Sequence, residues 1–240
     1  MRNFFSGSGR LAKFTLRKSR IEIIVWLAAI AGLTIGVGAA YLGLFATPEE
    51  LASMAAILDN PAMVALMGPI MGELTAETLF ASNMLVFTGI FVALMNIFFV
   101  VRNTRTEEEK GRVEVMRSLP TGRLSNLSGT LIVAVGLNLT LSVLVGLGLA
   151  AVGYTFGGAM LYGFALGVIG LVFMGLTAVL CQICANSKSA IGISIALLSF
   201  FYMLRAVGDI GTEALSYISP LGSRHVLQFS QATLFGPHRF

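Results

Sequence analysis

The chain has 240 residues, of which 56% are hydrophobic and only 12% are charged, about half the charged share of an ordinary soluble domain. A soluble protein of this size needs charged side chains to cover its surface, whereas a surface that faces lipid needs none. No Asp, Glu, Lys or Arg occurs between Leu124 and Ser187, which excludes a soluble fold. The composition therefore predicts an all-α, polytopic bundle of membrane-spanning helices.

The formal net charge of +4 comes from basic residues that flank apolar runs, which is the pattern of membrane orientation signals. No basic patch interleaved with aromatic residues and no nucleic-acid-binding motif accompanies them, so nucleic acid is not an expected partner. Membrane lipid is the expected surrounding of the chain.

Residues 1–20 are predicted to form a cytoplasmic, amphipathic segment that lies at the membrane surface. On a helical wheel its cations share one face and its large apolar residues share another: Arg10, Lys13, Arg17 and Arg20, against Phe4, Leu11 and Phe14. Such a helix lies in the interface with its cations against anionic headgroups. The alternative is a solvated topology signal.

Residues 21–222 form the predicted transmembrane domain, because they hold about five apolar runs. A span needs about 20 apolar residues at the rise of an α-helix. The predicted spans are Ile21–Ala46, Met84–Val101, Leu127–Val152, Ala159–Cys184 and Ala190–Leu204. Small residues four apart, which permit close helix approach, occur as Gly32 with Gly36 and as Gly163 with Gly167.

The charges of the loops predict the orientation. Residues 47–83 carry five acidic residues and no basic one, whereas the segment before Ile21 carries six basic residues and no acidic one. Basic segments stay in the cytoplasm, so we expect a multi-pass protein of the cell membrane with a cytoplasmic N-terminus. In the external segment, Thr47 and Glu50 are spaced for a capping box with Pro48 between them, and a second short helix is expected to end before Gly68.

The loop between the second and third predicted spans, residues 102–123, mixes glutamates with its basic residues. Between Thr106 and Leu119 it has a helical composition, with Glu108 and Arg112 spaced for an ion pair. Membrane orientation does not require the glutamates. The mixed charge therefore predicts a helix that docks a protein partner; the alternative is an ordinary solvated loop.

The same loop carries a resemblance to a known family. The string RTEEEKGRVEVMRSLPTGRLS, starting at Arg105, resembles the cytoplasmic loop of ABC-2-type exporter permeases, in particular the N-terminal half of tetronasin-type polyketide antibiotic exporter permeases. FTLRKSRIEIIVWLAAIAGLT at the first span, DNPAMVALMGP in the external segment, and FFYMLRAVGDIG with SYISPLG near the end agree with it. The resemblance covers about residues 14–222.

In that family the loop holds a coupling helix that sits on a separate ABC ATP-binding subunit. The resemblance implies a permease, not an enzyme, that moves a hydrophobic or amphipathic, antibiotic-like compound out of the cell. The implied contact residues are Glu107, Glu108, Glu109, Lys110, Gly111, Arg112, Glu114 and Arg117. The sequence has no G-x-x-x-x-G-K-[ST] phosphate-binding loop, so ATP hydrolysis would belong to the other subunit and no cofactor is expected.

The chain also departs from that family, whose long permeases hold two six-span halves. Residues 223–240 form an atypical tail that resembles nothing in the family and has no apolar run long enough to span a membrane. We therefore expect either pairing with a second permease half or a second copy, or a truncated half that does not transport. An ATP-independent secondary carrier is the alternative function.

A membrane redox protein that uses Cys181 and Cys184 is a further alternative. The two cysteines lie near the predicted C-terminus of a helix, where the dipole disfavours a thiolate, so packing is the expected role. Near the outer end of the fifth span, Arg205 and Asp209 are one turn apart and are expected to form a charge pair. Polar residues expected to be buried and hydrogen-bonded within the spans are Asn96, Asn138 and Gln182. The two histidines lie in the tail without other metal-ligating residues, so no metal site is expected.

Overall fold

The computed structural model describes residues 7–58, 60, 63, 75–111 and 125–210. The described residues form helices and no strand, and five of these helices are long and apolar enough to cross a membrane. The all-α bundle predicted from the sequence is confirmed. The predicted second external helix before Gly68 and the tail at residues 223–240 lie outside the described residues.

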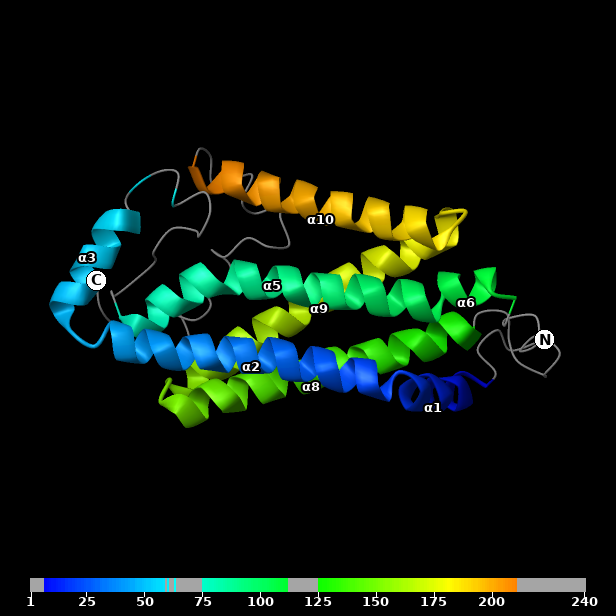
Figure 1. The fold of residues 1–240 in the computed structure, drawn as a ribbon, viewed down its shortest axis with the longest axis horizontal. Coiled ribbons are helices and arrows are strands. Elements are labelled where there is room, and N and C mark those ends of the chain that lie inside the picture. The colour runs from blue at the N-terminus through cyan, green and yellow to red at the C-terminus, as the bar shows by residue number, and fades with distance from the viewer. Residues whose placement is uncertain (1–6, 59, 61–62, 64–74, 112–124, 211–240) are drawn as a thin grey trace, which may run out of the picture.

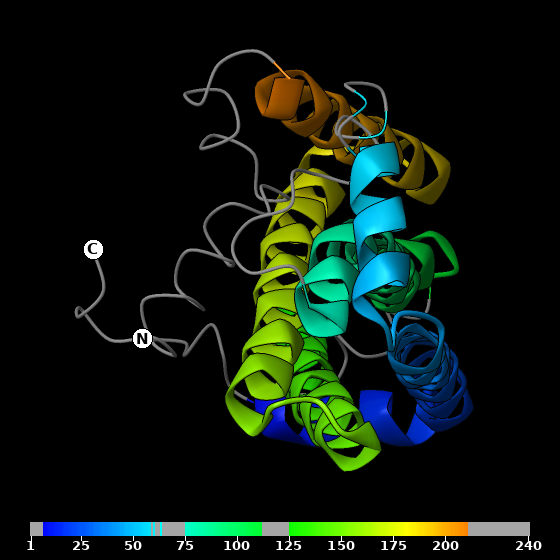
Figure 2. The same ribbon diagram turned by 90° about the vertical axis from the view of Figure 1, so that its left-hand side faces the viewer.

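The long helices lie side by side along the long axis of the molecule (Figure 1). Their bounds are α1 Ser8–Lys18, α2 Arg20–Leu44, α3 Pro48–Leu58, α5 Ala76–Asn103, α6 Arg105–Glu109, α8 Ser125–Val152, α9 Phe156–Ile183 and α10 Ser187–Ile210. The most apolar part of α5 is 67% buried, whereas the corresponding parts of α2 and α10 are 28% and 22% buried. Figure 2 shows why: α5 lies between α2, α9 and α10, and α2 and α10 lie on the outside.

Four of the five spans begin within a few residues of their predicted starts, but α5 begins at Ala76 instead of Met84. The last span, α10, also ends later than predicted, at Ile210 instead of Leu204. The predicted second span began only after two polar residues, Ser82 and Asn83, which belong to α5 and are buried in the bundle. Ser82 donates a hydrogen bond to the Thr78 carbonyl, and Asn83 donates one to the Tyr41 hydroxyl of α2. The Ser82 hydroxyl and the Asn83 side-chain nitrogen therefore have partners within the bundle, and the helix continues through both residues.

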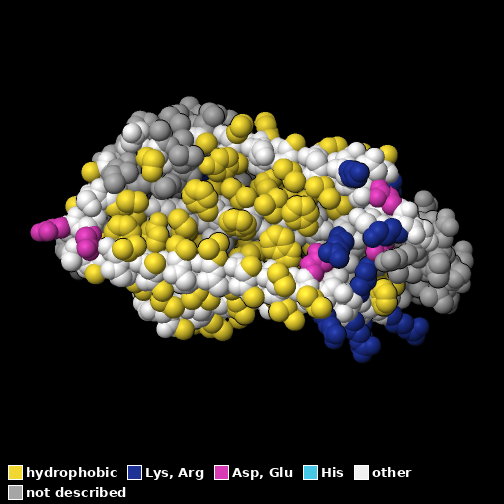
Figure 3. All heavy atoms as spheres, viewed as in Figure 1, with side chains coloured by type: hydrophobic (Ala, Val, Ile, Leu, Met, Phe, Trp, Pro, Cys, Tyr) yellow, Lys and Arg dark blue, Asp and Glu magenta, His cyan; other side chains and the backbone are white. Residues whose placement is uncertain are grey.

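Charged side chains gather at the two ends of the molecule, and a broad apolar band lies between them (Figure 3). Lys and Arg gather at the end where α1 and α6 lie, which we call the basic end. The opposite end carries α3 with Glu49 and Glu50 in its first turn. The separation of charge predicted from the loops is therefore present in the fold.

The predicted capping box at the start of α3 is confirmed. The Thr47 amide donates to Glu50 Oε2 at 3.0 Å, and the Glu50 amide donates to Thr47 Oγ1 at 3.3 Å. Hydrogen bonds to the Glu50 carboxyl from the side chain and the backbone of Thr47 lower the pKa of that carboxyl. The helix ends at Leu58, directly before the sequence Asp-Asn-Pro at residues 59–61, whose proline cannot continue a helix.

α1 is amphipathic, and it buries small residues against the protein. Ala12 and Thr15 are buried, whereas Phe14 is 52% exposed. A Cβ at Gly129 of α8 would lie 3.1 Å from the Ala12 amide nitrogen and from Leu11 Cβ. The two helices approach so closely that α1 presents small residues to α8, and the larger Phe14 lies on the outside.

The two predicted glycine pairs have different outcomes. A Cβ at Gly163 of α9 would overlap the carbonyl oxygen of Ser142 in α8, and a Cβ at Gly167 would overlap the Ser142 hydroxyl. This pair is at a close helix contact, as predicted. A Cβ at Gly32 or Gly36 of α2 would meet nothing within 4 Å, so the predicted contact at that pair is wrong.

A buried amide pair joins α5 to α8. Asn96 Nδ2 donates to Asn138 Oδ1 at 3.0 Å, and Asn138 Nδ2 donates to Asn96 Oδ1 at 2.7 Å. Each amide also donates to the carbonyl four residues earlier in its own helix. The expected interhelical hydrogen bond is confirmed for this pair, whereas Gln182 is exposed, contrary to its predicted burial.

We expect Gly163→Ala to destabilise the bundle, because its methyl group would overlap the backbone of α8, which cannot move without separating the helices. Such overpacking costs about 1–3 kcal/mol, so the thermal midpoint in detergent should fall by about 5 °C. The matched control is Gly175→Ala in the same helix, where a Cβ meets nothing within 4 Å. Circular dichroism melts measure both, and equal midpoints for the two variants would contradict the packing.

Candidate functional site

A short helix, α6, follows α5 at the basic end after a break at Thr104. The Thr104 hydroxyl donates to the Val100 carbonyl at 2.6 Å and the backbone leaves helical geometry there, with φ −115° and ψ −82°. α6 ends at Glu109, and Gly111 has a φ of +67°, a left-handed conformation that favours glycine. The helix predicted over Thr106–Leu119 is therefore interrupted after Glu109, and residues 112–119 lie outside the described residues.

Part of the predicted contact set lies beyond this turn. Arg112, Glu114 and Arg117 are outside the described residues, so their contacts stay a prediction. The five described members, Glu107 to Gly111, lie together on α6 and its terminal turn. Their side chains do not all face the same way.

Glu107 faces into the protein. It is only 5% exposed, and its Oε1 is 2.8 Å from Lys18 Nζ at the end of α1. Close by, Ser19 Oγ donates to Asn103 Oδ1 at 3.1 Å, and Arg102 pairs with Glu22 at 3.2 Å. The junction of α1 with α2 is thus joined to the junction of α5 with α6 by three polar contacts.

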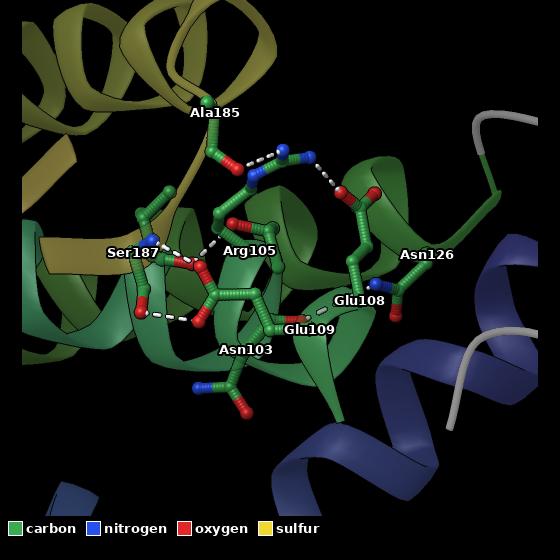
Figure 4. Close-up of polar contacts among 9 residues, drawn as sticks. Asn103, Arg105, Glu108, Glu109, Asn126, Ala185 and Ser187 are labelled. Atoms are coloured by element: carbon green, nitrogen blue, oxygen red, sulfur yellow. Dashed lines mark hydrogen bonds and ion pairs between the residues drawn. The ribbon is translucent and has the colours of Figure 1, made fainter. Parts of the chain in front are cut away.

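Glu109 caps the N-terminus of α10. Its carboxylate accepts hydrogen bonds from the Ser187 amide and, at 2.6 Å, from Ser187 Oγ (Figure 4). Ser187 is the first residue of α10, where unpaired amides and the helix dipole favour a negative charge. This glutamate therefore links α6 directly to the last described span.

Arg105 joins α6 to the connection between α9 and α10. One guanidinium nitrogen donates to the Ala185 carbonyl, and the other pairs with Glu108 Oε2 at 2.7 Å (Figure 4). The sequence predicted that Glu108 would pair with Arg112. The structure pairs Glu108 with Arg105, because one turn of helix brings these two side chains together. The predicted pair with Arg112 stays a prediction, because Arg112 lies outside the described residues.

We call residues 103–111, together with Lys18, Ala185 and Ser187, the α6 junction. The Asn103 carbonyl accepts a hydrogen bond from Asn126 of α8 at 3.3 Å, so the junction contacts α1, α8, α10 and the connection before α10. The exposed residues of α6 and its terminal turn are Glu108, Glu109, Lys110 and Gly111. A displacement applied to these exposed residues would reach four other parts of the bundle.

The other residues singled out from the sequence are the predicted charge pair of α10 and the two cysteines. Arg205 of α10 is fully buried, with its guanidinium carbon 5.4 Å from the centre of the Tyr202 ring. The side chain of Asp209 lies outside the described residues, so their charge pair stays a prediction. Cys181 and Cys184 are free, buried and packed in an apolar cluster with Val100, which is the packing role expected of them.

The sequence analysis missed Glu77, at the opposite end of α5 from Glu109. Its Oε1 accepts a hydrogen bond from the Thr155 amide at 3.1 Å, and its Oε2 accepts one from the Thr155 hydroxyl. Thr155 is the N-cap residue of α9. A threonine before a helix is a recognisable cap signal, but nothing in the sequence pairs it with a glutamate 78 residues away.

Comparisons with known proteins agree with a membrane permease. Residues 11–234 match the family described as the C-terminal domain of the multidrug efflux system permease Rv1217c. The chain is also 32% identical, over 224 residues, to the multidrug efflux system permease protein Rv1217c of Mycobacterium tuberculosis. That match covers 91% of this chain but 40% of the relative, so the chain spans less than half of the relative's length.

We expect Lys18→Met to destabilise the α6 junction, because it removes a cation beside the buried Glu107 carboxylate. The thermal midpoint should fall by about 5 °C, and the double variant Lys18→Met/Glu107→Gln should recover part of the loss. Arg102→Met is the control, because the Arg102 side chain is 67% exposed and exposed ion pairs contribute little. Additive effects of the two substitutions would contradict a direct Lys18–Glu107 interaction.

Proposed function

This chain belongs to the family of multidrug efflux system permeases represented by the C-terminal domain of Rv1217c, and from that premise we propose that it is a permease subunit of an ATP-driven, ABC-2-type exporter. Its cargo is a hydrophobic or amphipathic compound, antibiotic-like in character, that moves out of the cell. The basic end faces the cytoplasm, as the positive-inside rule requires.

The α6 junction is the observation that carries this proposal. A separate ATP-binding subunit needs an exposed contact at the cytoplasmic end and a rigid connection from it to the spans. Glu108, Lys110 and Gly111 supply exposed groups of both signs, and the segment that continues from them holds Arg112, Glu114 and Arg117. Subunit motion at this surface would move packed helices as rigid bodies.

The glutamates of the junction have two separate roles in this proposal. Glu107 and Glu109 keep α6 attached to α1 and α10 through Lys18 and Ser187. Glu108, although paired with Arg105, is 37% exposed at its side chain and is positioned to meet a partner. The first two transmit motion, and the third belongs to the contact surface.

A complete exporter needs more than this chain. The matched relative is more than twice as long as the matched segment, since the match covers 40% of it. We propose that the described spans work with a second permease half or a second copy of this chain. Together the two halves would enclose the pathway that the cargo follows.

The energy source is tested in inside-out membrane vesicles that carry the chain and its partner subunits. We expect these vesicles to accumulate a fluorescent amphipathic compound when ATP is added, and to continue when a protonophore collapses the proton gradient. Accumulation that requires the proton gradient and does not respond to ATP would identify a secondary carrier instead. Vesicles without the chain are the control.

The two roles of the glutamates are tested by matched variants. Glu108→Lys/Lys110→Glu reverses exposed charges, so we expect it to lower co-purification of the ATP-binding subunit and transport together, about tenfold. Glu109→Ala removes the α10 cap, so it should lower transport while the subunit still co-purifies. Glu49→Gln, at the opposite end, is the control. Normal transport in both junction variants would contradict the assigned coupling site.

A further inference from the structure

The outward face of α1 carries a group of exposed cations: Arg10, Lys13 and Arg17, continued by Arg20 at the start of α2. We propose that this face binds the headgroups of anionic phospholipids at the membrane surface that surrounds the basic end of the protein. The inference does not depend on the proposed function, because it concerns how the chain meets lipid and not what it transports.

Three other cations at the basic end are already paired. Lys18 contacts Glu107, Arg102 contacts Glu22, and Arg105 contacts Glu108. Within the described part of the chain, the four cations of the outward face make no ion pair, and α1 itself contains no acidic residue. The face therefore presents a concentrated positive charge that the protein does not neutralise.

The position of α2 sets the depth of these cations. Directly after Arg20, α2 exposes three large apolar residues: Ile21 is 71% exposed, Ile24 63% and Val25 60%. As the beginning of a membrane span, they contact hydrocarbon. Arg20 and the preceding Arg17 then lie at the level of the lipid headgroups, where anionic phosphates attract them.

Apolar side chains beside the cations favour lipid over a protein partner. Phe14 is 52% exposed and Leu16 is 50% exposed, and both would lie in water if α1 projected away from the membrane. Cations with neighbouring large apolar residues on a short helix are typical of a helix that lies in the interface. The apolar surface also continues directly into the lipid-facing start of α2.

The inner face of α1 holds this orientation. Ser8 Oγ and Ser128 Oγ of α8 share a hydrogen bond of 2.6 Å, Ala12 contacts Gly129, and Lys18 pairs with Glu107. Figure 2 shows α1 crossing beneath α8 toward the start of α2 instead of extending α2. The cations therefore stay on the outside, and lipid bound there contacts a helix that also supports the α6 junction.

Trp26 provides a native probe, because it is the chain's single tryptophan and is partly buried in the second turn of α2. The full chain is reconstituted into vesicles of phosphatidylcholine with a minor share of brominated phosphatidylglycerol, and into vesicles with the two lipids exchanged. Bromine quenches tryptophan fluorescence on contact. We expect phosphatidylglycerol to quench Trp26 more than its share of the vesicle would give.

The variant Arg10→Gln/Lys13→Gln/Arg17→Gln should lose this preference for phosphatidylglycerol. Each cation removed should lower the relative affinity for the anionic lipid by up to about fivefold. High salt should lower it in the unmodified chain, because salt screens exposed charges. Lys188→Gln is the matched control, an exposed cation at the same end. The variant keeps Lys18 and Arg20, so its membrane orientation keeps a basic signal.

A swap that conserves charge, Arg10→Lys/Lys13→Arg/Arg17→Lys, separates charge from folding, and it should keep the preference. Equal quenching by the two lipids in the unmodified chain would overturn the proposal, and so would an unchanged preference in the glutamine variant. If that variant instead lost a co-purifying ATP-binding subunit while its lipid preference stayed the same, the face would bind protein. Neither result bears on the ATP dependence of transport.

Discussion

The fold depends on the pairing of polar side chains along α5 inside an apolar bundle. Thr88 shares a hydrogen bond with Tyr162 of α9, Asn96 pairs with Asn138 of α8, and Asn103 accepts one from Ser19 beside α1. An unpaired polar group in hydrocarbon costs several kcal/mol. Each contact therefore fixes the register of α5 against a different neighbour, and α5 becomes the helix around which the others are arranged.

Glutamates at the two ends of the segment formed by α5 and α6 accept hydrogen bonds from the N-termini of two further helices. Glu77 caps α9 at one end of α5, and Glu109 caps α10 at the end of α6. Each carboxylate satisfies amides that a helix N-terminus leaves unpaired. At the basic end this arrangement brings the proposed contact for an ATP-binding subunit next to α1, whose outward face we assign to anionic lipid. The two surfaces are joined in the structure, because Lys18 at the end of α1 contacts Glu107 of the α6 junction.

Sequence reasoning located the candidate site but not its internal contacts. The mixed charge after the second span drew attention to residues 107–111, which the structure places together on α6 and its terminal turn. The sequence could not show that Glu107 is buried against Lys18, or that Glu109 caps Ser187, because these partners lie far apart in the chain. Reasoning from local spacing also did not name Arg105 as a partner of Glu108, although the two residues lie one turn apart on α6.

The sequence by itself determined the helical class, the number of described spans, the separation of charge between the two ends, and the capping box of Thr47 with Glu50. These features follow from local composition and from spacing within one helical turn. Only the tertiary structure decided which face of each helix meets protein. It placed Gly163 against α8 and left Gly32 open, and it turned Phe14 outward. Apolar residues suit both lipid and protein neighbours, so their pattern cannot distinguish the two.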